Sequence, residues 1–402
     1  MKKKIRILFM AHFASELSNT LVIFVLSIIL YQQTGSALII SYLWICYVTA
    51  SIISHIFMGP IIDKVNRKYV MLLSEWGRAL VFIVLLLLFY FEYVNTFIII
   101  SSAFFVGFLE PLFHPSCLSY ISKMVKREKL KKVNSRLEII AQIGTIAGPG
   151  IGGVLVSMTN EYYTLGFMIL MLIISGVFVS MLPDNSSDVE VQKKWIEDLM
   201  VGWRFFISQK ILVWLGVLIL TVNTAFGAIQ PLFLPYINEV LNKGDFEYGL
   251  TNTVIACGMI TGSLIVSVKF LKNKTRIVML SSLALSGMTF TFMGLNDIFY
   301  LFLIFVFFNG VFVSIFNINN TYLYQTLIPH NLVGRVFAIR GLVAITGLPI
   351  GAFIGGLLTE VIRINLVFII MGLLIIIPSI FFLFLKPLLH INELDMPKEE
   401  KG

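Results

Sequence analysis

Apolar residues dominate the chain in long runs, and short polar stretches separate these runs. Read with a window of about 19 residues, the pattern predicts membrane-spanning helices, because each run can cross a hydrocarbon core about 30 Å thick. The twelve predicted spans cover 7–31, 37–58, 69–90, 96–121, 134–158, 162–182, 211–236, 247–268, 277–295, 299–324, 336–361 and 365–385. We therefore expect an all-α membrane protein with 12 transmembrane helices.

The longest polar connection divides these spans into two sets of six. It begins with turn-forming residues, and its second part spaces Trp195, Leu199, Trp203 and Phe206 as on one face of an amphipathic helix at the inner membrane surface. We expect an N-terminal six-helix bundle over 1–182, a cytoplasmic linker over 183–210, a C-terminal six-helix bundle over 211–385 and a cytoplasmic tail over 386–402.

The two halves share a pattern of glycines. Gly144, Gly148, Gly152 and Gly153 of the fifth span return as Gly347, Gly351, Gly355 and Gly356 of the eleventh span, each 203 residues later. Repeated halves in parallel orientation are typical of a transporter architecture whose two bundles are related by a pseudo-twofold axis. In that architecture the substrate binds between the bundles, near the middle of the membrane.

Composition and charge agree with a membrane protein. Of the 402 residues 58% are hydrophobic and 13% are charged, whereas soluble domains average about 25% charged residues. A soluble enzyme, a disulfide scaffold and a disordered binding segment are therefore excluded. The net charge of +8 does not indicate nucleic-acid binding, because 27 of the 30 Lys and Arg residues fall on alternate connections or in the span ends that adjoin them. By the positive-inside rule both termini are cytoplasmic.

A basic motif joins the second and third spans. It reads Gly-Pro-Ile-Ile-Asp-Lys-Val-Asn-Arg-Lys, and its functional positions are Gly59, Asp63, Lys64, Arg67 and Lys68. Glycine permits a tight turn, the aspartate can interact with a helix N-terminus, and the cations can hold lipid phosphate. The alternative interpretation is an ordinary basic cytoplasmic loop.

The fifth span carries a second motif, Gly-Thr-Ile-Ala-Gly-Pro-Gly-Ile-Gly-Gly. Its marked positions are Gly144, Gly148, Pro149, Gly152 and Gly153. Small residues at every fourth position allow two helices to pack backbone to backbone, and proline bends the helix. The alternative is the small-residue packing that is common in membrane helices.

These two strings resemble motif A and motif C of the major facilitator superfamily. Shorter segments at 74–78 and 329–336 are similar to its branch of macrolide-efflux-type and siderophore-export proteins. The resemblance implies two six-helix bundles, alternating access, gating by motif A and a cavity lined by spans 1, 4, 7 and 10. Motif C implies export, because it marks drug and metabolite antiporters. The arginine of motif B, which is implicated in proton coupling, is absent from span 4, so that mechanism does not carry over.

Ionisable residues within the spans cost about 2.5–3.5 kcal/mol each on insertion scales, so each needs a partner or a function. Glu75 and Arg78 are three residues apart in the third span. This spacing places both side chains on one helix face, where they can neutralise each other. We expect a structural ion pair.

Two other carboxylates lie in spans that the resemblance assigns to the central cavity. His12 lies four residues before Glu16, and His114 lies four residues after Glu110, so each helix presents a glutamate and a histidine on one face. Intramembrane carboxylates serve as proton relays in transporters. We expect these four residues to couple protons and to bind substrate charge; hydrogen bonding between helices is the alternative.

Neutral polar and aromatic residues repeat along the faces of the same cavity spans. A mixed aromatic and amide surface suits a bulky, partly apolar ligand that keeps some hydrogen bonds, although such stripes also serve packing. The expected substrate-cavity residues are Asn19, Asn223, Phe226, Gln230, Asn309, Phe316, Asn320 and Tyr324.

The sequence contains no P-loop, no zincin-type metal spacing and no G-x-S-x-G serine, and its five scattered histidines predict no metal site. We expect a proton-driven antiporter without a cofactor that exports a hydrophobic or amphiphilic compound, such as a macrolide-like drug, and thereby gives antibiotic resistance. It is expected to act as a monomer in a bacterial cytoplasmic membrane, with substrate, protons and lipid as partners. The alternatives are siderophore export, a lipid flippase, nutrient uptake, and a membrane receptor or scaffold.

Overall fold

The computed structural model describes residues 2–125, 127–159, 161–184, 195–266, 275–329 and 332–384. Every element in these ranges is helical. Twelve of the described helical segments are long and apolar enough to cross a membrane. The hydropathy prediction of an all-α protein with twelve spans is thus confirmed.

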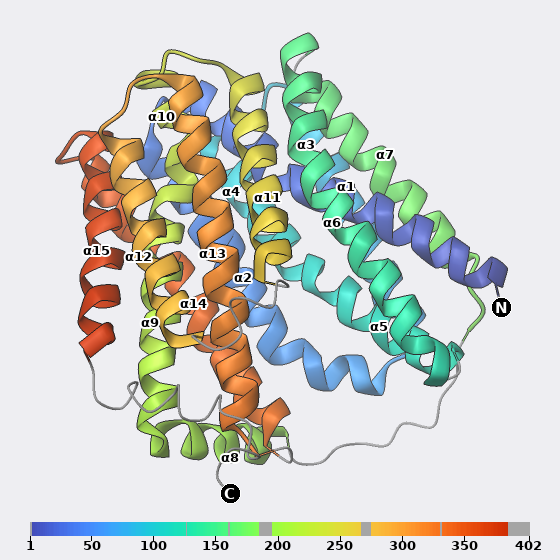
Figure 1. Ribbon diagram of the computed structural model, residues 1–402. Helices are drawn as coiled ribbons and strands as arrows, with labels where there is room; N and C mark the ends of the chain where they lie inside the picture. Colours follow the sequence, from blue (N-terminus) through green and yellow to red (C-terminus); the bar gives the residue numbers. More distant parts are fainter. Residues whose placement is uncertain are drawn as a thin grey trace, which may run out of the picture. The chain divides into compact units, whose positions relative to one another are not determined.

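The chain divides into two compact units (Figure 1). Unit 1 comprises residues 1–193 and 244–253, and unit 2 comprises residues 194–243 and 254–402. Unit 1 contains α1 (Lys2–Thr34), α2 (Ala37–Lys64), α3 (Arg67–Tyr90), α4 (Thr96–Leu109), α5 (Phe113–Met124), α6 (Arg127–Met158) and α7 (Glu161–Ser180). Unit 2 contains α8 (Trp195–Ser208), α9 (Lys210–Ile229), α10 (Phe233–Glu239), α12 (Thr275–Gly294), α13 (Phe299–Leu327), α14 (Val333–Thr359) and α15 (Ile364–Phe384). Helix α11 (Asp245–Val266) begins in unit 1 and continues in unit 2.

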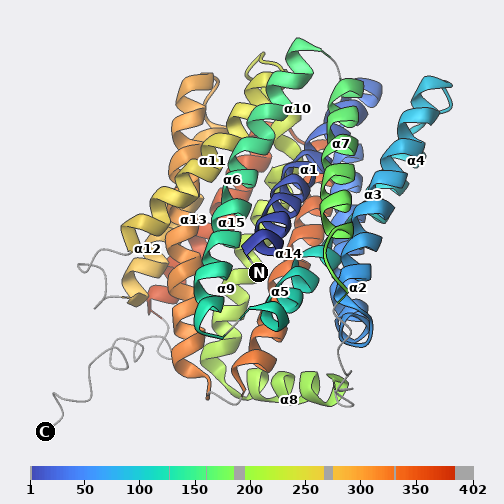
Figure 2. The same ribbon diagram turned by 90° about the vertical axis from the view of Figure 1, so that its right-hand side faces the viewer.

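The pairing of helices inside unit 1 is repeated inside unit 2. In unit 1, α1 packs against α6 and α7, as both views show (Figures 1 and 2), while α2 packs against α4 and α3 against α7. In unit 2, α9 packs against α14 and α12 against α15. Helix α11 meets α13 at Gly258, where a Cβ atom would lie only 3.2 Å from the backbone nitrogen of Val311. The corresponding spans of each half therefore pair in the same way, as expected for a repeat.

Two of the spans are interrupted by short 3₁₀ turns. Glu110–Leu112 separates α4 from α5, and Gln230–Leu232 separates α9 from α10. The second residue of each turn is a proline, which lacks an N–H and clashes with the preceding turn of an α-helix. The hydropathy pattern predicted unbroken spans over 96–121 and 211–236. The breaks matter because Glu110 and Gln230, two predicted site residues, occupy their first positions.

The expected amphipathic helix of the linker is α8, which lies across the ends of α9 and α14 in both views (Figures 1 and 2). Phe206 is buried and stacks on Tyr324 with ring centroids 6.4 Å apart, whereas Trp203 is exposed. Residues 185–194 of the predicted linker and the predicted tail 386–402 lie outside the described residues, as does the side chain of Trp195. The predicted domain boundaries therefore stay a prediction.

Candidate functional site

A stripe of polar side chains follows α1. His12 and Ser15 are fully buried, and Glu16 and Asn19 are partly buried. These positions recur every three or four residues, so they share one face of the helix. The side chains on this face meet three groups of partners in unit 1: a histidine of α5, an ion pair of α3, and the glycines of α6.

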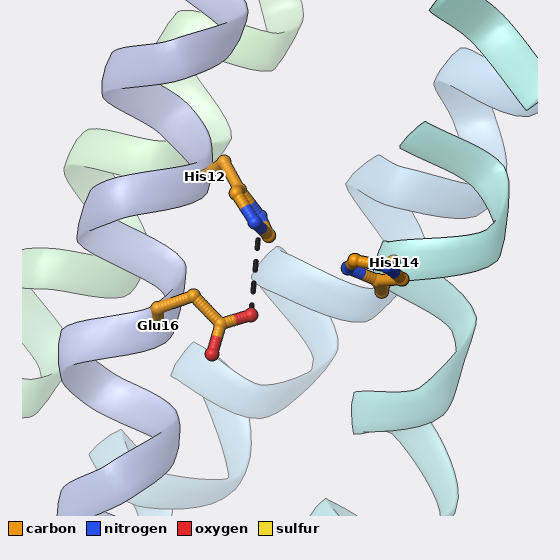
Figure 3. Close-up of side chains that lie close together, drawn as sticks. All are labelled: His12, Glu16 and His114. Carbon is orange, nitrogen blue, oxygen red and sulfur yellow. Dashed lines mark ion pairs between the residues drawn. The ribbon is translucent and has the colours of Figure 1, made fainter. Parts of the chain in front are cut away.

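The first group joins His12, Glu16 and His114 (Figure 3). Nδ1 of His12 lies 3.8 Å from Oε1 of Glu16, and the rings of His12 and His114 have centroids 5.5 Å apart. Phe113 also stacks on the ring of His12, with ring centroids 5.9 Å apart. The structure thus brings together three of the four residues predicted for proton coupling.

The fourth residue, Glu110, contacts a different helix. Its carboxylate accepts a hydrogen bond from the hydroxyl of Tyr47 in α2. Gly107, one turn before Glu110, allows this approach, because a Cβ atom there would lie 3.0 Å from the ring of Tyr47. Sequence reasoning missed Tyr47, since nothing in the local pattern of the second span distinguishes it from the other aromatic residues.

The second group is a buried ion pair in α3. Nη2 of Arg78 lies 2.6 Å from Oε1 of Glu75, and both side chains are completely buried. Ser15 of α1 bridges the pair, since its hydroxyl donates to Glu75 at 2.9 Å and accepts from Arg78 at 3.0 Å. Asn19, a predicted cavity residue, accepts a further hydrogen bond from Arg78. The pair therefore fastens α3 to the polar stripe of α1.

The third group consists of the motif C glycines of α6, which are all buried. A Cβ atom at Gly144 would lie 2.8 Å from Cβ of Glu16, and one at Gly152 would lie 3.0 Å from the ring of Phe24. Between them, the hydroxyl of Thr20 lies 3.5 Å from the carbonyl oxygen of Gly144. A Cβ atom at Gly153 would lie 3.1 Å from the Cα of Gly249. Motif C thus lets α6 approach the backbone of α1 next to Glu16.

We expect Gly148→Ala to destabilise unit 1 by about 1–3 kcal/mol, the usual cost of overpacking. The added methyl group would lie 2.8 Å from Cβ of Thr20, so α1 and α6 would have to separate. Gly166→Ala in α7 is the matched control, because no atom lies within 4 Å of a Cβ atom there. Thermal unfolding of the purified variants in detergent measures the difference. Equal melting temperatures for the two variants would contradict this role of motif C.

Part of motif A fastens the start of α3 within unit 1. Nε of Arg67 donates to the hydroxyl of Ser119 in α5 at 3.3 Å, and Nζ of Lys68 lies 3.1 Å from the carboxylate of Asp184, after α7. The backbone of the remaining motif A residues belongs to the last turns of α2, but the side chains of Asp63 and Lys64, and the surroundings of Gly59, lie outside the described part.

The predicted cavity residues of unit 2 differ in exposure. Phe316, Asn320 and Tyr324 are buried completely, as is Asn309, whose amide nitrogen donates to Ser286 and Thr289 of α12. Asn223, Phe226 and Gln230 of the seventh span are partly exposed. The role of all seven residues in a substrate cavity stays a prediction. In the structure, the four completely buried residues make contacts inside unit 2.

Asn223 is the counterpart of Glu16. A Cβ atom at Gly347 would lie 3.0 Å from Cβ of Asn223, just as one at Gly144 would lie 2.8 Å from Cβ of Glu16. Because Gly347 follows Gly144 by the repeat offset of 203 residues, α9 and α1 present equivalent positions. The carboxylate of unit 1 is therefore replaced by a neutral amide in unit 2.

Unit 2 instead contains a partly buried cation, which is one of the 27 basic residues assigned above to the cytoplasmic side. Arg340 lies inside α14, where Nη2 donates to Asn320 and to Thr321, both at 3.1 Å. Its guanidinium carbon lies 5.2 Å from the ring centroid of Tyr324, a cation–π contact. The sequence did contain a sign that Arg340 lies inside a helix, because this residue falls within the predicted span 336–361.

Known proteins resemble the chain over most of its length. The family profile described as Major Facilitator Superfamily matches residues 8–269 and 216–401. Macrolide efflux protein A of Streptococcus pyogenes is 23% identical over 363 residues, which cover 87% of this chain and 88% of that protein. Multidrug efflux pump Tap of Mycolicibacterium fortuitum is 24% identical and covers 91% of this chain and 90% of its own. Enterobactin exporter EntS of Citrobacter koseri is 24% identical, and the match covers 74% of this chain and 72% of that protein.

Proposed function

Because the chain belongs to the Major Facilitator Superfamily, we propose that it exports a hydrophobic or amphiphilic compound, such as a macrolide-like drug, in exchange for protons. Membership makes it a multi-pass membrane transporter of small molecules and not an enzyme. Its relatives named for efflux support the outward direction. We expect it to act as a monomer in the cytoplasmic membrane of a bacterium, with both termini in the cytoplasm.

One observation supports proton coupling. Two carboxylates lie within spans of unit 1, and neither is paired with a lysine or an arginine among the described residues. Among the described residues, neither Glu16 nor Glu110 forms an ion pair with Lys or Arg, in contrast to Glu75. A carboxylate inside a membrane protein marks an ion pathway or a proton relay, because an unpaired charge is expensive there. Glu16 and Glu110 are therefore proposed to bind protons and the cationic or amphiphilic substrate alternately.

The proposed cycle follows alternating access. Protonation neutralises the carboxylates when the site opens to one side, and the substrate replaces the protons when it opens to the other. The amides Asn223 and Gln230 of unit 2 would hold the substrate through neutral hydrogen bonds. Arg67 and Lys68 of motif A are proposed to gate the change, since their contacts with Ser119 and Asp184 are side-chain contacts that can be broken.

A second candidate is export of an endogenous metabolite such as a siderophore. The similarity to an enterobactin exporter supports it. The two candidates share the fold and the direction of transport, so they differ only in the compound that is carried.

Transport by the purified protein in proteoliposomes under an imposed pH gradient tests both candidates. We expect a macrolide to move in the direction opposite to the proton flow. An ionophore that collapses the pH gradient should stop this movement. A siderophore added to parallel vesicles distinguishes the second candidate. If the compound moves at the same rate with and without the gradient, antiport is rejected. If only lipid moves, the protein is a flippase instead.

A further inference from the structure

Three side chains with metal-binding atoms converge inside unit 1. His12 and Glu16 come from α1 and His114 comes from α5, and one ligand atom of each lies within 4.8 Å of the other two (Figure 3). The spacing of four residues sets the first two on one face of α1. The third is added only by the packing of α5.

The ring of His12 has no hydrogen-bond partner. It is completely buried, and both of its nitrogens are unsatisfied. The distance of 3.8 Å from Nδ1 to Glu16 is beyond hydrogen-bond length. A buried polar group without a hydrogen-bond partner destabilises the folded protein, so a ligand that accepts a lone pair from this ring stabilises it.

The surroundings of this cluster favour a cation. Glu16 interacts electrostatically with the carboxylates of Glu75, Glu110 and Glu138 and with a single guanidinium, that of Arg78. Arg78 is already paired with Glu75 at 2.6 Å. Among the described residues Glu16 therefore has no Lys or Arg ion-pair partner, and an ionised carboxylate without one attracts a positive ion more strongly inside a protein than in water.

We propose that His12, Glu16 and His114 form a binding site for a divalent transition-metal cation of the Zn²⁺ class. Two imidazole nitrogens and one carboxylate oxygen are the ligands of open zinc sites, which keep a further position for water or another ligand. Mg²⁺ and Ca²⁺ prefer sites made of oxygen ligands. The ligand set therefore selects a transition metal against these more abundant ions.

The three side chains need only a small movement to reach metal-binding geometry. Ligand atoms about 2.1 Å from a tetrahedral metal lie about 3.4 Å from one another, compared with the present limit of 4.8 Å. The side chain of Glu16 is 17% exposed and can change its rotamer. His114 is partly exposed and lies in the first turn after the break at Glu110–Leu112.

This site does not rest on the proposed export activity, although Glu16 takes part in both. Metal binding is a property of unit 1 at equilibrium and needs neither a substrate nor a proton gradient. If the protein transports no drug, the proposed metal site is not rejected. If it binds no metal, the export proposal is not rejected.

The test measures Zn²⁺ binding by the purified full-length protein in detergent, free of any histidine tag and stripped with a chelator. Competition with a chromogenic chelator gives the affinity, and Co²⁺ gives visible absorption bands that report nitrogen and oxygen ligands. We expect one metal ion per chain. His12→Gln, His114→Gln and Glu16→Gln should each weaken binding by about 10-fold or more, since even changes next to metal ligands cost 10–100-fold.

His55→Gln is the matched control, because His55 is an exposed histidine of α2 whose Nδ1 lies 2.8 Å from the carbonyl oxygen of Ser51. This variant should bind Zn²⁺ like the unaltered protein. His114 is partly exposed, so His114→Gln should fold even if His12→Gln, at a buried position, does not. Thermal melting curves show whether each variant is folded. The proposal is overturned if the unaltered protein shows no saturable binding, or if His114→Gln binds as well as His55→Gln.

Discussion

Cells that produce the Glu16→Gln or the Glu110→Gln variant are expected to retain the exported compound as strongly as cells that lack the protein. Glutamine matches glutamate in size and keeps hydrogen bonding, but it can neither bind nor release a proton in the working pH range. If proton and substrate charge exchange on these carboxylates, the cycle stops when either one is neutral in all states. Efflux of a fluorescent or radiolabelled macrolide from energised cells measures the loss, at equal protein level in the membrane.

Glu138→Gln is the control for this pair. Glu138 is an exposed acid of α6 that accepts a hydrogen bond of 3.0 Å from Gln142, so its replacement should reduce efflux far less than the loss of Glu16 or Glu110. Tyr47→Phe removes the hydroxyl that donates to Glu110 and should reduce efflux less than the loss of the carboxylate. Efflux at the unaltered rate in both glutamine variants would reject the role of these residues.

The Arg78→Leu variant is expected to lose about 3–5 kcal/mol of unfolding free energy, the typical result of removing one partner of a buried ion pair. The carboxylate of Glu75 would remain completely buried without its cation, and Ser15 and Asn19 of α1 would lose a donor. Unfolding in mixed micelles with increasing denaturing detergent measures the change. Arg136→Leu, at an exposed arginine of α6, should have a much smaller effect.

The double variant Glu75→Leu with Arg78→Leu separates the value of the pair from the cost of an orphaned charge. Replacing a buried ion pair by apolar residues of similar volume is often neutral. We therefore expect the double variant to recover most of the stability that Arg78→Leu loses. A double variant as unstable as the single one would mean that the hydrogen bonds to α1, rather than charge neutralisation, hold α3 in place.

Much of the fold follows from local properties of the sequence. The number of spans depends on the length of apolar runs, and the repeat is visible in glycines spaced by 203 residues. The breaks before Phe113 and Phe233 were not predicted, although Pro111 and Pro231 mark them. Hydropathy does not register a helix break that leaves both flanking segments apolar, so proline chemistry is needed to locate it.

The candidate site was predictable only in part, because its contacts join different helices. The spacing of His12 and Glu16 on one helix, and that of Glu75 and Arg78 on another, can be read from a sequence. The same rule suggested that Glu110 and His114 would act together. In the structure the carboxylate of Glu110 accepts a hydrogen bond from Tyr47 of α2, while His114 lies beside His12 and Glu16.

The sequence by itself determined the twelve spans, the two related halves and the positions of motifs A and C, since these depend on hydrophobicity and spacing along the chain. Only the tertiary structure decided which polar side chains meet. It brought His114 to His12 and Glu16, turned Glu110 to Tyr47, and set Asn223 where the repeat has Glu16. The physical reason is that such contacts depend on the rotation and depth of each helix against its neighbours, which interhelical packing decides and periodicity within one helix does not.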